Sequence, residues 1–458
     1  MPFYKSAAFA AALLAPAVLA AQPASEEDVD EVVVIGHTVS TSLATVEVDR
    51  EMLVDTANVL KDIPGANVNA NGPITGIAQY RGMYGDRVSV VIDQLGVVSG
   101  GPNAMDAPLS YVSPMITREL AVTRGIASVS LAPESIGGHV ATTLSRGDFS
   151  KGPGALSGFV GTRYSGNGAV STSAGRLTLA SDRHKVSLLA EVDDGDDIDT
   201  PVGTIRPSRL HRERSDLSYA FSGDRGAIML FAGRLDTTDT GTPALPMDIR
   251  YIETDLAGAQ VEFEAAEGVS LRGGFAWNDV EHLMDNFGLR QAPMAPMHRQ
   301  NLTTGTGGHM NLEANFALPA GSLAIGFDGV VADHDATITN PNNAMFRVAN
   351  FVDVERNLAS MFAEWRKAGD GADLELGLRF KRVDASAGEV AASGMMGDMG
   401  TNVDLLAGAF NAADRDLRFD SVDAVLKYRR SSDSGTEWHV ELGSKTRAPS
   451  YLSLIHIS

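Results

Sequence analysis

The sequence predicts a mixed α/β domain followed by an antiparallel transmembrane β-barrel, and three observations lead to this fold class. The chain of 458 residues begins with an export signal, and residues 46–150 mix helix-like and strand-like patterns. From residue 151 onward, strand-like stretches recur that are apolar on one side only. Alternation alone also allows a soluble β-sandwich or β-helix, but export and the preceding α/β segment favour a barrel between lipid and water.

The N-terminus reads "MPFYKSAAFAAALLAPAVLAAQPA". In it, Lys5 precedes an apolar run and then a stretch of small residues, which predicts a signal peptide over residues 1–21. An acidic stretch follows, within a periplasmic segment predicted over residues 22–45. No later stretch has 18 or more consecutive apolar residues, so no transmembrane helix is expected.

The α/β domain is predicted over residues 46–150. Asp55 to Asp62 has the pattern of a short helix that ends before a Pro-Gly pair. Asp86 to Asp93 and Arg118 to Gly125 are predicted strands, because β-branched and apolar residues dominate them.

The barrel part is predicted over residues 151–452. Its clearest strand is "ADLELGLRFKR", in which apolar residues from Ala372 to Phe380 alternate with polar ones. Roughly a dozen such strands fit into this range at the usual strand length. Two irregular stretches, residues 193–214 and 385–416, are expected to be extracellular loops.

Composition excludes several function classes. The formal net charge is -21, so no basic face is expected that could bind a nucleic acid. There is no cysteine, which suits an oxidising compartment. No nucleophile–base set, phosphate loop or zinc-protease motif occurs, so neither an enzyme nor a resident cofactor is expected.

Several segments, in order, resemble the TonB-dependent outer-membrane receptors. "DEVVVIG" resembles the TonB box, "LKDIPGANVN" the opening of the plug, and "YRGMYGDRVSVVIDQLGV" and "ITRELAVTRGIASVSLAPESIGGHVATTL" its later parts. The resemblance implies an α+β plug domain inside an antiparallel transmembrane β-barrel of about 22 strands in the bacterial outer membrane. It also implies that a TonB-type energy-coupling protein in the periplasm binds the box, formed by Asp30, Glu31, Val32, Val33, Val34, Ile35 and Gly36.

A narrower resemblance links two segments to the copper-transporting members of this family. "GGPNAMDAPLSYVSP" is similar to their plug loop, and "HLMDNFGLR" to the barrel segment paired with it. The resemblance implies a metal site formed by Met105, His282 and Met284, with Gly101 where those receptors have a cysteine. Thioether sulfur and imidazole suit Cu(I), whereas methionine is otherwise a common gap filler.

The C-terminus departs from the family pattern. "SKTRAPSYL" resembles a segment from the middle of the barrel, and the chain then ends with "SLIHIS". The sequence is therefore interpreted as C-terminally truncated, with an incomplete barrel and a non-native tail over residues 453–458. Unpaired edge strands are not tolerated in hydrocarbon, so a stable monomeric barrel is not expected from this chain alone.

The sequence thus predicts TonB-dependent import of copper, as the ion or a complex, across the outer-membrane lipid. Import of an iron-siderophore or another organic complex is the first alternative, although aromatic residues make up only 6% of the chain. A passive porin-like barrel is the second alternative. It explains neither the plug nor the TonB-box-like segment.

Overall fold

The structure, a computed structural model, describes residues 43–47, 53–101, 106–152, 154–369, 371–394, 398–432 and 436–450. The predicted signal peptide (1–21), the TonB box (Asp30 to Gly36), Met105 and the predicted tail (453–458) lie outside the described residues.

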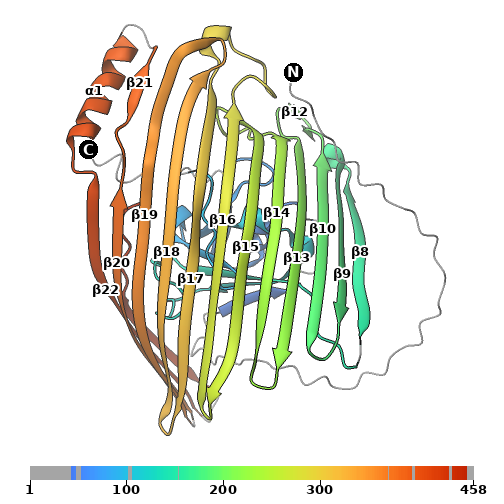
Figure 1. Cartoon of the computed structure of the whole chain (residues 1–458), viewed down its shortest axis with the longest axis vertical. Coiled ribbons are helices and arrows are strands. Elements are labelled where there is room, and N and C mark those ends of the chain that lie inside the picture. The colour runs from blue at the N-terminus through green and yellow to red at the C-terminus, as the bar shows by residue number, and fades with distance from the viewer. Residues whose placement is uncertain are drawn as a thin grey trace, which may run out of the picture. The chain divides into compact units, whose positions relative to one another are not determined.

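A 14-stranded antiparallel sheet dominates the described part of the chain (Figure 1). Its strands follow one another in sequence order and are joined by short turns or by longer loops. Their bounds are β8 Ala155–Ser165, β9 Val170–Ala180, β10 His184–Gly195, β13 Leu210–Gly223, β14 Gly226–Thr240, β15 Asp248–Ala266, β16 Val269–Asp285, β17 Gln300–Leu318, β18 Gly321–Asn340, β19 Asn343–Gly369, β20 Ala372–Ser386, β22 Asp416–Ser431 and β23 Glu437–Ser444, with β21 Ala391–Ser393 paired to β19. In the described residues β8 and β23 are the two edges and do not pair with each other, so the barrel is not closed.

The side chains of this sheet are apolar outside and polar inside, which confirms the predicted barrel pattern. In β20, Leu378 and Phe380 are 51% and 62% exposed, whereas Glu375 and Arg379 are completely buried. A water-soluble sheet would bury the apolar face instead. Among the described residues, no helix is both long and apolar enough to cross a membrane.

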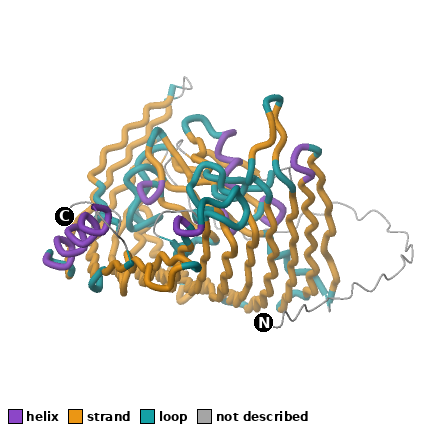
Figure 2. Tube along the Cα trace, turned by 90° about the horizontal axis from the view of Figure 1, so that it is seen from above, coloured by secondary structure: helices purple, strands orange, loops and turns teal. Residues whose placement is uncertain are grey.

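The plug domain lies on the concave side of the sheet (Figure 2). Its four-stranded sheet has the order β1 (Leu43–Glu47), β6 (Thr117–Thr123), β7 (His139–Leu144) and β5 (Ser89–Ile92). A second sheet contains β2 (Ala66–Ala70), β3 (Gly76–Tyr80) and β4 (Met83–Tyr84). Because β1 begins at Leu43, the plug sheet includes residues before the expected boundary at 46. Buried apolar residues such as Leu60, Leu120 and Val140 join the two sheets into one core.

Short 3-10 helices connect these strands. The predicted helix at Asp55–Asp62 is η1 (Thr56–Asp62), a 3-10 helix capped by Asp55, whose carboxylate accepts the N–H of Ala57. The strand predicted from Asp86 begins three residues later, because Gly85–Arg87 form η2. The predicted strand at Arg118–Gly125 is confirmed as β6. The other 3-10 helices are η3 Pro108–Tyr111, η4 Pro114–Ile116, η5 Asn167–Ala169 and η6 Ala295–Met297.

The two predicted loops contain regular structure, so the prediction of irregular stretches is wrong for much of both. Residues 193–214 include the paired ends of β10 and β13 and the hairpin of β11 (Ile198–Thr200) and β12 (Gly203–Ile205). A buried ion pair between Arg212 and Asp193, at 2.6 Å, stabilises the extended ladder. Residues 385–416 contain α1 (Asp398–Ala412).

Residues 125–134, between β6 and β7, are held by polar side chains of the barrel wall. Lys427 donates to Ser128 Oγ at 2.7 Å, and Ser128 Oγ donates to Glu375 at 2.6 Å. Arg356 donates to both carboxylate oxygens of Glu134, at 2.7 and 2.8 Å. Buried charges need such partners, so these contacts fix the plug against β19, β20 and β22.

His139 makes the stability of the plug depend on pH. Burial, and to a smaller extent the charge of Lys445, lowers the pKa of His139 to about 4 from its ordinary 6.5. The unfolded chain therefore takes up a proton between these values and the folded plug does not, so stability present above pH 6.5 is lost as the pH falls towards 4. We expect a loss of about 3 kcal/mol, since one pKa unit corresponds to about 1.4 kcal/mol. Hydrogen exchange of β5 and β7, corrected for the intrinsic rate, measures it. The variant His139→Gln should lack this dependence, and an equal dependence in that variant would contradict the assignment.

Candidate metal site

His282 and Met284 lie on β16, close to the loop that leads to β17. Their side chains are only 1% and 2% exposed, whereas Phe275 and Trp277 on the same strand are 44% and 41% exposed. Since residues two apart share one side of a strand, His282 and Met284 both face the plug. This inward orientation agrees with the sequence prediction. The role of His282 and Met284 as metal ligands stays a prediction.

Gly101 of the plug lies directly opposite His282. A Cβ atom built on Gly101 would be 4.0 Å from His282 Nδ1, 3.8 Å from Thr303 Oγ1 and 3.7 Å from Asp106 Oδ1. The structure therefore brings together Gly101, where the resemblance implies a cysteine in the copper-transporting receptors, and the histidine predicted to bind metal. Met105 lies between the two described ends of this loop, Gly101 and Asp106, and is itself outside the described residues.

The imidazole of His282 has no hydrogen-bond partner at either nitrogen among the described residues. A buried polar group without a partner costs on the order of 1 to 3 kcal/mol. Both nitrogens of His282 can therefore act as donors to a ligand. The described residues contain no group of three or more His, Cys, Asp or Glu side chains that could hold a metal ion.

Asp106 connects the plug segment before the loop to the segment after it. Its Oδ2 accepts hydrogen bonds from the Gly100 N–H at 2.5 Å and from the Tyr111 hydroxyl at 2.6 Å. Burial raises the pKa of Asp106 to about 6, and the hydrogen bonds from Tyr111 and Gly100 partly oppose this. Burial and the Asp106 charge raise the pKa of Tyr111 well above its ordinary value, so Tyr111 remains a hydrogen-bond donor.

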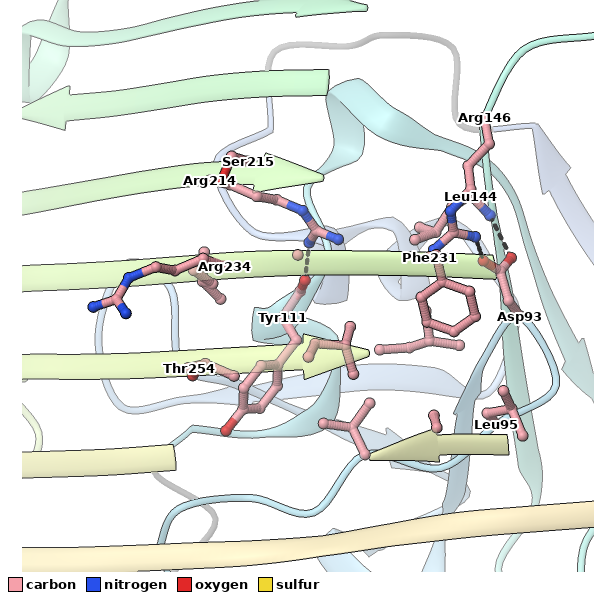
Figure 3. Close-up of a pocket in the computed structure, with 16 residues that line it drawn as sticks. Asp93, Leu95, Tyr111, Leu144, Arg146, Arg214, Ser215, Phe231, Arg234 and Thr254 are labelled. Atoms are coloured by element: carbon pink, nitrogen blue, oxygen red, sulfur yellow. Dashed lines mark hydrogen bonds and ion pairs between the residues drawn. The ribbon is translucent and has the colours of Figure 1, made fainter. Parts of the chain in front are cut away.

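Tyr111 also connects the loop to the barrel wall and borders a cavity (Figure 3). Arg214 of β13 donates to the Tyr111 carbonyl, and Arg146 forms an ion pair with Asp93 on the other side of the cavity. The cavity is small and lies between the plug and strands β13 to β16. Its walls are mainly apolar, with Phe231 prominent among them.

Two further buried histidines contact the same stretch of the plug. His309 Nδ1 accepts the Gly96 N–H at 2.7 Å, and His334 Nε2 lies 2.7 Å from the Ser99 carbonyl oxygen. These contacts could not be predicted from the sequence. Its only signal is the alternation along β17 and β18, which places both histidines on the inward face of their strands. Each has a structural role here, because each forms a hydrogen bond with a backbone group of the plug, at Gly96 or at Ser99.

Other described methionines are exposed, unlike the buried Met284. Met294 and Met297, in the loop after β16, are 73% and 55% exposed, and Met310 on β17 faces outward. His298 stacks on Phe287 with ring centroids 4.5 Å apart. None of these described residues contributes to the site around His282.

Comparisons with known proteins identify the plug and the fold. Residues 37–139 match the family model described as TonB-dependent Receptor Plug Domain. No curated protein matches the sequence significantly.

Similar solved structures include the copper transporter OprC, with 20% identity, a TM-score of 0.75, and coverage of 90% of this chain and 64% of that one. The FrpB iron transporter from Neisseria meningitidis has 12% identity, a TM-score of 0.64, and coverage of 91% and 65%. The ferric citrate transporter FecA has 13% identity, a TM-score of 0.61, and coverage of 88% and 62%. The chain thus spans less than two thirds of each of these proteins.

These similarities agree with the predicted fold class and with the outer membrane as the location that accompanies it. The chain carries the plug domain of the TonB-dependent receptors, together with part of the β-barrel fold that surrounds this plug.

Proposed function

We propose that the chain belongs to an energy-coupled importer of copper, as the ion or a complex, across the outer membrane. Met105, His282 and Met284 would capture the metal between plug and barrel. The observation that carries this proposal is the buried imidazole of His282, without a partner among the described residues and facing the plug loop at Gly101. The similarity in fold to OprC supports the choice of cargo.

The proposed partners follow from the same assignment. A TonB-type protein in the periplasm would add the segment Asp30 to Gly36 as a strand to its own sheet. The exposed apolar faces of the barrel strands would contact lipid. Copper is the cargo in this proposal, and no resident cofactor is required.

Copper binding by the purified chain tests the proposal. We expect His282→Ala and Met105→Ala each to weaken Cu(I) binding by about tenfold or more, because each removes a donor atom. Competition with a Cu(I) chelator gives the affinity, and elemental analysis gives the stoichiometry. Met310→Leu is the matched control, since Met310 faces outward.

Import of an iron complex is the second candidate, because FecA and FrpB are iron transporters of the same fold. A chain that binds ferric citrate or a ferric siderophore, and no copper, would support this candidate and contradict the copper proposal. Unchanged copper binding in His282→Ala would remove His282 from the site.

A further inference from the structure

The two oxygens of Asp106 have different surroundings. Oδ2 accepts two hydrogen bonds, from Gly100 and Tyr111, and these fix the carboxylate in one orientation. Oδ1 is buried and has no hydrogen-bond partner in the part of the chain that the structure describes. The side chain is 2% exposed, so bulk water does not satisfy Oδ1 either.

Asp106 Oδ1 and His282 Nδ1 both lie close to Gly101. Oδ1 lies 3.7 Å from the position of a Cβ on Gly101, and His282 Nδ1 lies 4.0 Å from that position. Metal–nitrogen and metal–oxygen bonds of this kind are about 2.0–2.2 Å long, so an ion between Oδ1 and Nδ1, outside the Gly101 backbone, would bond to both after small shifts of the two side chains. Gly101 has no side chain that would occupy this space.

We infer that Asp106 is a further ligand of the metal site, whose Oδ1 oxygen pairs with the imidazole of His282. This inference rests on the proposed function and adds Cu(II) to the forms of copper that the site accepts. Neither the family resemblance nor the sequence pattern assigns a ligand role to Asp106.

The donor pair changes the chemistry of the site. A site made only of thioethers and imidazole selects Cu(I), whereas nitrogen and oxygen donors suit Cu(II). With Asp106 the site holds Cu(II) through His282 and Oδ1, and Cu(I) through His282 and the Met284 sulfur. The carboxylate also compensates one positive charge of the bound ion in a buried place. Since the chain has no cysteine, no thiol is present to reduce Cu(II) on binding.

The experiment compares the two oxidation states in two variants. We expect Asp106→Asn to weaken Cu(II) binding by about tenfold or more and to change Cu(I) binding by less than about threefold, a free-energy difference above 1 kcal/mol. Met284→Leu, which keeps the apolar volume, should have the opposite preference. Cu(II) affinity is measured by competition with an amino-acid chelator, and Cu(I) affinity by competition with a Cu(I) chelator under anaerobic reduction.

Two controls separate ligation from structure. Tyr111→Phe removes a hydrogen bond to Oδ2 but leaves Oδ1 in place, so a purely structural role of Asp106 would make it resemble Asp106→Asn. Asp224→Asn removes the same charge from an exposed turn, where the side chain is 83% exposed. The electron paramagnetic resonance spectrum of the Cu(II) form should change in Asp106→Asn and remain unchanged in Asp224→Asn.

The outcomes distinguish the inference from the proposed function. Selective loss of Cu(II) in Asp106→Asn supports the inference. Equal loss of both forms, or a wild-type chain that binds Cu(I) and not Cu(II), overturns it while the copper proposal stands. A wild-type chain that binds copper in neither form overturns the proposed function itself.

Discussion

Replacing Gly101 with cysteine should tighten Cu(I) binding by about a hundredfold. A good ligand commonly contributes a few kcal/mol, each 1.4 kcal/mol is about tenfold in affinity, and a thiolate is the strongest soft donor that a protein offers. Among the described residues, every atom near a Cβ at position 101 lies at ordinary contact distance, 3.7 Å or more, so these residues leave room for the cysteine side chain. The sulfur would extend from there towards His282 Nδ1.

Gly101→Ser is the matched control, since it has nearly the same size but an oxygen in place of sulfur. Affinities from competition with a Cu(I) chelator should rank cysteine well above both serine and glycine. Gly100→Cys should instead disturb the loop, because a Cβ there would lie 2.5 Å from Val280 Cγ1. Equal Cu(I) affinities for cysteine and serine at position 101 would show that the metal does not bind beside this residue.

Replacing Arg379 with methionine should destabilise the contact between plug and barrel by about 3 to 5 kcal/mol, as expected when one partner of a buried ion pair is removed. The Arg379 guanidinium donates to the Val129 carbonyl at 2.5 and 2.7 Å and to Asp328 at 2.5 Å. It is fully buried and stacks over the Phe362 ring at 4.6 Å. Methionine would leave the Asp328 charge and the Val129 carbonyl without this donor.

Hydrogen exchange of residues 125–134 measures the effect. A loss of about 3 kcal/mol speeds local opening by roughly a hundredfold. Arg382→Met on the same strand is the control, because Arg382 faces outward and pairs with Asp420 in an exposed position. Exchange rates that are equal in the two variants would show that Arg379 does not hold the plug.

The sheet could be predicted well from sequence, and β20 shows why. Alternation between apolar and polar residues reports which face each side chain occupies, and Leu378 and Arg379 lie on the faces that it predicts. The pattern does not report which partner a polar residue meets. Arg379 contacts Val129, 250 positions away, and nothing local in either segment indicates that pairing.

The surroundings of His282 could be predicted only in part, for a related reason. His282 and Met284 share a recognisable spacing, so their inward orientation could be predicted from the strand. Asp106 has no such signal, because an aspartate in a Gly-Pro-Asn loop is an ordinary turn residue. Its burial depends on Tyr111 and on the barrel wall, both of which are only defined in three dimensions. Helix α1 was missed because the glycine- and methionine-rich sequence at its start favours a loop.

The plug lies very close to β17, where that strand has glycines on its inner face. A Cβ on Gly305 would lie 2.5 Å from the Ser99 carbonyl oxygen, and one on Gly307 would lie 3.0 Å from Val98 Cγ2. If the plug segment 96–101 moves away, this strip of wall presents bare backbone whose N–H and C=O groups are already paired with β16 and β18. In the proposed importer, a cargo that passes along β17 would meet backbone without side chains at Gly305 and Gly307, and His309 on the same inner face would lose its hydrogen bond from Gly96 and offer a ring nitrogen to the cargo.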